Sequence, residues 1–259
     1  MNIFLTRPDS DIPAAPPPLG AMSLAAYIRL HRDDNIKIYD ARSHMASPEK
    51  AAEIAREFGA DVVGISSFSM EAPQSFALAK AVKKLLPKCK IIIGGPFPTS
   101  DPETALSEPA IDAACIGEGE QAFLEALNSL EKSGDIQPTP GIALRNNGSV
   151  TGTDKRGFID DLDTLPELAW DLVDLNHYWN NPPKRPMMNK LRRSKKGVSI
   201  FTTRGCPYGC TYCHNLFGKK ARKRSAEKVV DELKMLYHDY GVRELEFLDD
   251  IFNVDMKRA

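Results

Sequence analysis

The chain has 259 residues, of which 42% are hydrophobic and 27% charged, a composition typical of a globular protein with a buried core and room for two domains. No run of 18 apolar residues occurs, so we predict no membrane span, and the first residues lack the basic and apolar regions of a secretion signal. Five cysteines, three of them within eight residues, indicate a metal site in a reducing cytoplasm rather than disulfides.

The net charge of −1 hides an uneven distribution. Residues 184–224 hold 13 of the 34 Lys and Arg and none of the 35 Asp and Glu, so the rest of the chain carries a net charge of −14. Such a basic block can receive an anionic substrate or cofactor or a nucleic-acid backbone, and it can equally be a solvated surface.

The first 135 residues are predicted to alternate between strands and helices. We expect strands at 3–6, 36–40, 61–67, 89–93 and 113–116, and helices at 19–31, 48–58, 72–86 and 121–132. Strands separated by helices of this length indicate βαβ units in a parallel sheet. We therefore predict a flavodoxin-like, doubly wound α/β domain over residues 1–135.

Loops rich in Gly, Ser and Pro follow the predicted strands, at residues 6–19, 66–72, 94–103 and 117–120. Doubly wound sheets bind ligands at the carboxyl ends of their strands, and small residues let the backbone approach a large flat or phosphorylated ligand. The loops together predict a ligand site. No GxGxxG motif follows the first strand, so a dinucleotide ligand has little support.

Residues 136–196 break this alternation. Asn146-Asn147-Gly148 predicts a hairpin between residues 141–144 and 150–153, and the rest reads as an irregular linker with one short helix. Trp170 and Trp179 are expected to pack between the domains, because tryptophan side chains bury a large area.

The alternation resumes at residue 197. We predict a strand at 198–203, a helix at 225–240 with Ser225 as its N-cap, and a strand at 244–248. Two parallel strands and one helix would leave sheet edges and apolar helix surface uncovered.

Cys206, Cys210 and Cys213 follow the first of these strands with the spacing CxxxCxxC. Thiolates bind iron and zinc well. Closed ferredoxin sites use four cysteines, so three would leave one iron of a four-iron cluster with an open position. Zinc, with His214 or Cys115 as a fourth ligand, is the alternative, although His214 directly follows Cys213 and zinc pairs are usually two separated CxxC units.

The cysteine motif and its surroundings, TTRGCPYGCTYCHNLFGKK, SAEKVVDEL and GVRELEFLDDIF, resemble the radical S-adenosylmethionine (radical SAM) enzymes. The phrases PPPLGAMSLAAYIR, DVVGISSFSM, GGPFPTSDPE and IGEGEQAFLEAL resemble the cobalamin-binding domain that some members carry. The resemblance spans almost the whole chain, with a weaker middle. It implies a cobalamin-binding domain at residues 1–135, a linker at 136–196 and the first βαβ part of a TIM-like radical SAM barrel at 197–259.

The resemblance also implies three cofactors, namely a four-iron four-sulfur cluster, S-adenosylmethionine and cobalamin. The residues that it implies are Cys206, Cys210 and Cys213 for the cluster, Tyr212, Asp249 and Asp250 for S-adenosylmethionine, and Ser66, Ser67, Gly94, Gly95, Pro96, Gly117 and Glu118 for cobalamin. In this family, reductive cleavage of S-adenosylmethionine gives a 5′-deoxyadenosyl radical that abstracts hydrogen from the substrate. The implied activity is methyl transfer to an unactivated carbon of a small molecule, with flavodoxin or ferredoxin as electron donor, and ring-forming members also exist.

Two local departures from the family pattern concern cobalt. No DxHxxG motif is present, and His44 has the wrong spacing to be the lower cobalt ligand, so we expect it on a surface loop. Phe97 stands where the phrase GGPFPT would be expected to hold histidine.

The third departure is length. A barrel of about six βα units needs roughly 180 residues, whereas 63 follow residue 196. We therefore expect the chain to be the N-terminal part of a longer enzyme. Two alternatives stay open, a catalytically incomplete cobalamin and iron–sulfur binding module and, as a minor one, a zinc-binding nucleic-acid protein.

Overall fold

The computed structural model describes residues 1–10, 16–146, 148–152, 154, 156–181, 193–213, 216–253 and 255–258. In its first half, strands and helices alternate as predicted. The strands are β1 (Asn2–Arg7), β2 (Asn35–Asp40), β3 (Val62–Ser66), β4 (Lys90–Gly94) and β5 (Ala113–Cys115), and the helices are α1 (Leu19–His31), α2 (Pro48–Phe58), α3 (Ala72–Leu85) and α6 (Gly119–Ser133). Three short helical segments, η1 (Ser69–Glu71), α4 (Pro96–Ser100) and α5 (Pro102–Ala105), lie in the loops.

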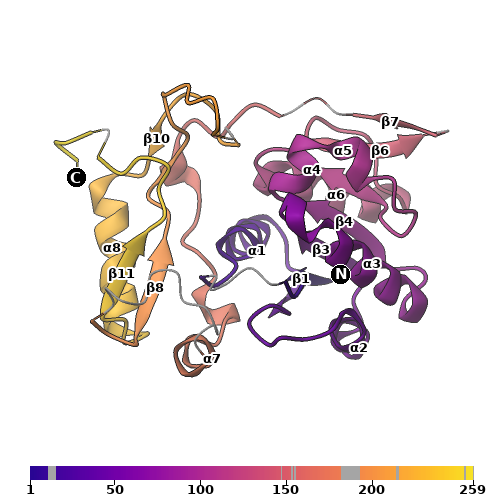
Figure 1. The fold of residues 1–259 in the computed structure, drawn as a ribbon, viewed down its shortest axis with the longest axis horizontal. Coiled ribbons are helices and arrows are strands. Elements are labelled where there is room, and N and C mark those ends of the chain that lie inside the picture. The colour runs from indigo at the N-terminus through magenta and orange to yellow at the C-terminus, as the bar shows by residue number, and fades with distance from the viewer. Residues whose placement is uncertain are drawn as a thin grey trace.

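The sheet follows the order β2-β1-β3-β4-β5-β6-β7, and its first five strands are parallel. The order 2-1-3-4-5 is that of flavodoxin-like doubly wound folds, so the predicted fold is confirmed. Helices α2 and α3 bury alanine, leucine and valine against one face, while α1 and α6 cover the other (Figure 1). All five parallel strands therefore point their carboxyl ends toward one edge, where the predicted ligand loops lie.

The predicted hairpin is formed by β6 (Ile142–Asn146) and β7 (Ser149–Thr151), and it extends this same sheet. Strand β6 pairs antiparallel with β5, with Cys115 opposite Ile142. The sheet therefore continues beyond residue 135 into the segment that we had assigned to the linker. Asn147, at the tip of the predicted turn, lies outside the described residues.

The rest of the middle segment contains η2 (Leu162–Thr164), η3 (Trp170–Leu172) and α7 (Leu175–Asn180) in place of the single predicted helix. Trp170 is buried in a cluster with apolar side chains of α1 and of the C-terminal elements. Its Nε1 donates to Glu232 Oε1 (3.0 Å), and Trp179 Nε1 donates to the Gly197 carbonyl (3.0 Å). The predicted packing role of both tryptophans is confirmed.

The C-terminal βαβ unit consists of β8 (Gly197–Ile200), α8 (Ala226–His238) and β11 (Glu244–Phe247), with β8 and β11 parallel. Ser225 Oγ accepts the Lys228 N–H (3.2 Å), as expected of an N-cap. The single strand predicted at 198–203 is wrong. Strand β8 ends at Ile200, and β9 (Thr203–Arg204) pairs antiparallel with β10 (Arg222–Lys223).

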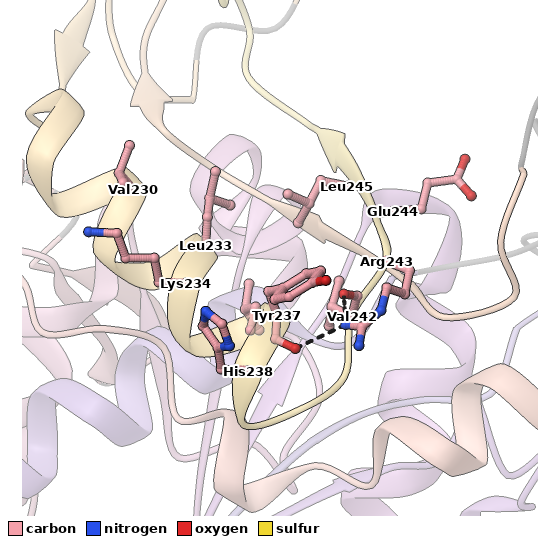
Figure 2. A pocket seen from close by; sticks show the side chains of 10 residues that line it. Val230, Leu233, Lys234, Tyr237, His238, Val242, Arg243, Glu244 and Leu245 are labelled. Atoms are coloured by element: carbon pink, nitrogen blue, oxygen red, sulfur yellow. Dashed lines mark hydrogen bonds between the residues drawn. The ribbon is translucent and has the colours of Figure 1, made fainter.

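An open apolar groove runs along α8 and β11 (Figure 2). Val230 and Tyr237 on its wall are 45% and 52% exposed, whereas Val229 and Leu236 are buried. The expected uncovered helix surface is therefore present on one side of α8. Within the part of the chain that the structure describes, no helix is both long and apolar enough to cross a membrane.

Candidate functional site

The loops that follow β3 and β4 lie against each other at the carboxyl edge of the sheet. Ser66 pairs with Gly94 in the strand register, and the Ser67 N–H donates to the Gly94 carbonyl (2.9 Å). Ser67 is fully buried, and its Oγ accepts a hydrogen bond from Ser75 Oγ (2.8 Å). The structure thus brings together Ser66, Ser67, Gly94, Gly95 and Pro96, all predicted from sequence.

Gly95 and Gly117 complete this edge. Gly95 has a φ of +96°, and a Cβ there would lie 3.0 Å from the Ser67 carbonyl oxygen. Thr99 Oγ1 donates to the Gly95 carbonyl (2.8 Å) and accepts the Gly117 N–H (3.0 Å), which joins the loops after β4 and β5. A tightly held edge lined by backbone fits a large flat ligand such as the corrin ring of cobalamin.

Two residues that we singled out for cobalt lie near this edge. His44 is exposed on the loop after β2, as expected, and its ring stacks on those of Tyr39 and His177, with centroids 4.9 and 4.0 Å away. Phe97 is buried at the start of α4 and packs against Phe76. Phe97 therefore belongs to the core that supports the β4 loop.

Buried ion pairs hold the other loops at this edge. Arg7 binds Asp40 with two guanidinium nitrogens (2.7 and 2.5 Å), and Tyr178 OH also donates to Asp40 (2.7 Å). Although burial opposes the charge, the Arg7 guanidinium holds the pKa of Asp40 below its usual range. Arg42 pairs with the fully buried Glu71, which also accepts the Phe68 N–H (3.0 Å).

The cysteine loop begins and ends at the β9–β10 pair. Gly205 has a φ of +86°, and the Cys206 N–H donates to the Gly218 carbonyl (3.1 Å). Cys206 is half-buried, while Cys210 and Cys213 are exposed and linked by a backbone hydrogen bond from Cys213 N–H to the Cys210 carbonyl (3.2 Å).

The donor set of this loop fits an iron–sulfur cluster. Each thiolate of such a cluster binds a different iron, so three ligands need not converge on one point. In the described ranges, no three His, Cys, Asp or Glu side chains are arranged around a single metal ion. Of the alternative fourth zinc ligands, Cys115 is buried within β5 and His214 lies outside the described residues.

The residues predicted for S-adenosylmethionine lie in different environments. Tyr212 is 91% exposed on the cysteine loop, and Asp250 is exposed after β11. The Asp249 carboxylate accepts the N–H groups of Thr202 and Thr203 (2.6 and 2.7 Å) and the Thr202 hydroxyl (2.6 Å). The bond from Thr202 takes its N–H away from β11, and the ladder between β8 and β11 ends at Ile200.

Sequence reasoning missed the most heavily bonded cluster of the site, four charged side chains that we call the carboxylate–arginine cluster: Glu118, Glu120, Arg204 and Arg222. The two glutamates follow β5, and the two arginines are cross-strand partners in β9 and β10. Arg222 binds Glu118 (2.8 Å), and Arg204 binds Glu118 (3.2 Å) and Glu120 (2.6 Å). All four side chains are at most 15% exposed.

Electrostatics within this cluster favour the charged forms of Glu120 and Arg204. Burial raises the pKa of Glu120, but the Arg204 charge and hydrogen bond outweigh it, so the pKa lies below the usual range. Burial likewise opposes the Arg204 charge, and the two carboxylates raise its pKa. Because the Glu118 carboxylate is engaged with both arginines, its backbone is the part that can contact a ligand. The sequence signal was an Arg two residues before the first cysteine and the alternating glutamates of GEGE.

Thiol labelling should separate the five cysteines. Burial raises the pKa of Cys89 and Cys115 to about 12, so both should remain thiols and resist iodoacetamide in the native protein at pH 8. Cys210 and Cys213 should be labelled first, because they are exposed. Peptide mapping after timed alkylation measures this order, and early labelling of Cys89 would contradict the buried sheet.

Family comparisons match two parts of the chain. The "B12 binding domain" family matches residues 11–127, and the "Radical SAM superfamily" matches residues 200–255. The first match covers β2 to β5 and the loops after β3, β4 and β5, and the second covers the cysteine loop, α8 and β11.

Individual relatives match both parts at once. An uncharacterised methyltransferase of Pyrococcus horikoshii is 32% identical over 100% of this chain and 55% of its own length, and cytidylyl-2-hydroxyethylphosphonate methyltransferase of Streptomyces wedmorensis is 31% identical over 82% and 44%. The chain thus spans about half the length of the curated relatives it matches. Among solved structures, the radical SAM methyltransferase TsrM of Kitasatospora setae superposes with a TM-score of 0.75 at 16% identity, over 99% of this chain and 49% of TsrM. The cobalamin-dependent radical enzyme OxsB gives 0.80 at 16% identity, over 97% and 34%.

Proposed function

The chain belongs to the radical SAM proteins that carry an N-terminal B12-binding domain, and on this premise we propose that it serves a cobalamin-dependent methyltransferase acting on an unactivated carbon. The observation that carries the proposal is the presence in one chain of a backbone-lined sheet edge and a three-cysteine loop, tied together by buried ion pairs. The small-molecule substrate is left unassigned.

In this proposal each cofactor has its own part of the chain. Cys206, Cys210 and Cys213 hold a four-iron four-sulfur cluster, and the loops after β3, β4 and β5 hold cobalamin. When bound, the cluster supplies reductive cleavage of S-adenosylmethionine and the cobalamin supplies a methyl carrier. The proposed cobalamin contacts are Ser66, Ser67, Gly94, Gly95, Pro96, Gly117 and Glu118, the last through its backbone.

The residues of this chain contribute to the proposed chemistry by holding the cofactor-binding loops in position. Gly95 lets the β4 loop lie directly against the backbone of Ser67 in the β3 loop, and the Thr99 hydroxyl holds Gly117 next to them. Asp249 holds the backbone of Thr202 and Thr203 at the entry of the cysteine loop. We propose Tyr212 and Asp250 as the residues beside S-adenosylmethionine, with Asp249 acting through this backbone.

The proposal includes an electron donor and a compartment. Basic residues near the exposed cysteines, among them Lys219 and Lys220, suit an acidic carrier such as flavodoxin or ferredoxin. Buried thiols and a cysteine-ligated cluster both suit a reducing cytoplasm. The domain boundaries at residues 135 and 196 also stay predictions. The hairpin of β6 and β7 lies after the first boundary, although β6 pairs with β5 of the first sheet.

Anaerobic reconstitution with iron and sulfide tests the cluster. The native chain should bind about four iron atoms with the broad visible absorbance of a cluster, and Cys210→Ala should lose most of both. Cys89→Ala is the matched control, because Cys89 is a buried core residue. Zinc bound without iron, or an unchanged Cys210→Ala variant, would reject the assignment. A chain that loads cluster and cobalamin without releasing 5′-deoxyadenosine would instead support the binding-module alternative.

A further inference from the structure

The carboxylate–arginine cluster lies where the cysteine loop meets the B12-binding sheet. Arg204 is the last residue of β9 before the loop, and Arg222 begins β10 after it, so the two arginines mark both ends of the loop. Their carboxylate partners come from the sheet side, where Glu118 is the N-cap of α6 after β5 and Glu120 lies in the first turn of α6. The cysteine loop is therefore held at both ends by groups that belong to the B12-binding sheet.

The positions of the two arginines give the carboxylates a stabilising role. Arg204 and Arg222 are directly opposite in the β9–β10 register, and like charges opposite each other destabilise a strand pair. Glu118 lies between them and binds both, and its Oε2 also accepts the Ile159 N–H (2.8 Å). Glu118 therefore offsets the repulsion between the two arginines that close the loop.

The segment after β5 that carries Glu118 also contacts the predicted ligand loops. The Gly117 N–H is bonded to Thr99, whose hydroxyl also donates to Gly95. Glu120, two residues after Glu118, binds Arg204 and accepts the hydroxyl of Ser23 in α1 (2.7 Å). Hydrogen bonds thus connect Gly95 to Gly117, the backbone continues to Glu118 and Glu120, and ion pairs connect these to Arg204, two residues before Cys206.

We propose that Glu118, Glu120, Arg204 and Arg222 are positioning residues that couple cobalamin occupancy to the order of the cysteine loop. This inference rests on the proposed function, since it assumes that cobalamin binds the sheet edge. A ligand that orders residues 94–99 and 117 stabilises the position of Glu118 and Glu120, and these hold the loop closed around half-buried Cys206. By thermodynamic reciprocity, a bound cluster also strengthens cobalamin binding.

The test measures alkylation of Cys206 in the cluster-free protein, with and without hydroxocobalamin. In the native chain, cobalamin should slow Cys206 labelling by about fivefold or more. Glu120→Gln keeps the size of the side chain but removes its charge, so labelling should be faster and the protection by cobalamin should be smaller than in the native chain, with Glu118 still binding both arginines. Resistance of Cys89 reports in the same digest that the sheet is folded.

Lys220→Gln is the matched control, because Lys220 lies in the same loop but its ion pair with Asp160 is exposed on both sides. This variant should keep the full protection. Arg204→Lys retains the positive charge but lacks the second terminal nitrogen that lets arginine bind Glu118 and Glu120 together. Cobalamin should therefore protect Cys206 only partially in this variant. Iron release to a chelator from the reconstituted protein should be slowest in the native chain and Lys220→Gln, faster in Arg204→Lys and fastest in Glu120→Gln.

The outcomes separate this inference from the proposed function. Cobalamin that binds the native chain without protecting Cys206 overturns the coupling and leaves the proposed function standing. Equal protection in Glu120→Gln and the native chain also overturns it. If hydroxocobalamin does not bind at all, both the cobalamin assignment and the coupling are rejected.

Discussion

Gly205→Ala is expected to abolish cluster binding, lowering reconstituted iron from about four atoms per chain to almost none. Gly205 has a φ of +86°, where an alanine costs about 1–2 kcal/mol. The larger effect is steric, because a Cβ would lie 2.5 Å from the Lys220 carbonyl oxygen, 2.8 Å from that of Phe217 and 2.9 Å from that of Gly218. All three are backbone atoms on the returning side of the loop, so the loop would have to open to admit the methyl group.

Gly209→Ala is the matched control for this substitution. Gly209 lies between Cys206 and Cys210, its φ is not positive, and a Cβ there would meet only the Lys219 ammonium at 3.8 Å. This variant should bind iron like the native chain. Iron counting and visible absorbance after anaerobic reconstitution compare the two. Full iron loading of Gly205→Ala would show that closure of the loop at Gly205 is unnecessary for cluster binding.

The sheet could be predicted because the signals for its strands and helices lie within short segments and recur along the chain. Buried strands such as Val62–Ser66 are continuously apolar, and the bounds of α1 and α2 were predicted to the residue. Pro48 with Ser47 as N-cap and Gly59 at a φ of +71° fix the two ends of α2. The pairing of β6 with β5 could not be predicted, since a hairpin signal defines the turn and carries no information on which strand it joins.

The candidate site likewise has residues that could be predicted from the sequence and residues that could not. The glycines, serines and cysteines could be proposed from sequence because small residues gather in the loops after the strands and three thiols lie within eight residues, and their cofactor contacts stay predictions. Arg204 and Arg222 were only counted in a basic block, because their function depends on Glu118, 86 and 104 residues away along the chain. The same distance explains why Glu118 was assigned to cobalamin while its carboxylate in fact binds the arginines.

Trp170→Ala is expected to destabilise the junction between the B12-binding sheet and the C-terminal βαβ unit by about 3–5 kcal/mol. Trp170 is 1% exposed and packs with Leu19 and Met22 of α1 on one side and Val198, Ile200 and Leu236 on the other. Truncation leaves a cavity that two separate elements line, and neither can collapse without losing its other contacts. At roughly 2–4 °C per kcal/mol for a domain of this size, the melting temperature should fall by roughly 6–20 °C in thermal denaturation followed by circular dichroism.

Trp170→Phe separates packing from hydrogen bonding at the junction. Phenylalanine retains most of the buried ring but loses the Nε1–H that donates to Glu232, a carboxylate that is fully buried and also paired with Arg224. Because Arg224 continues to neutralise Glu232, the cost should be limited to about 1–3 kcal/mol for the lost donor. A fall as large as that of Trp170→Ala would mean that the hydrogen bond to Glu232, rather than the volume of the ring, holds the two parts together. A melting temperature unchanged in both variants would mean that the two parts are held by the ion pairs around Glu118 and not by the apolar junction.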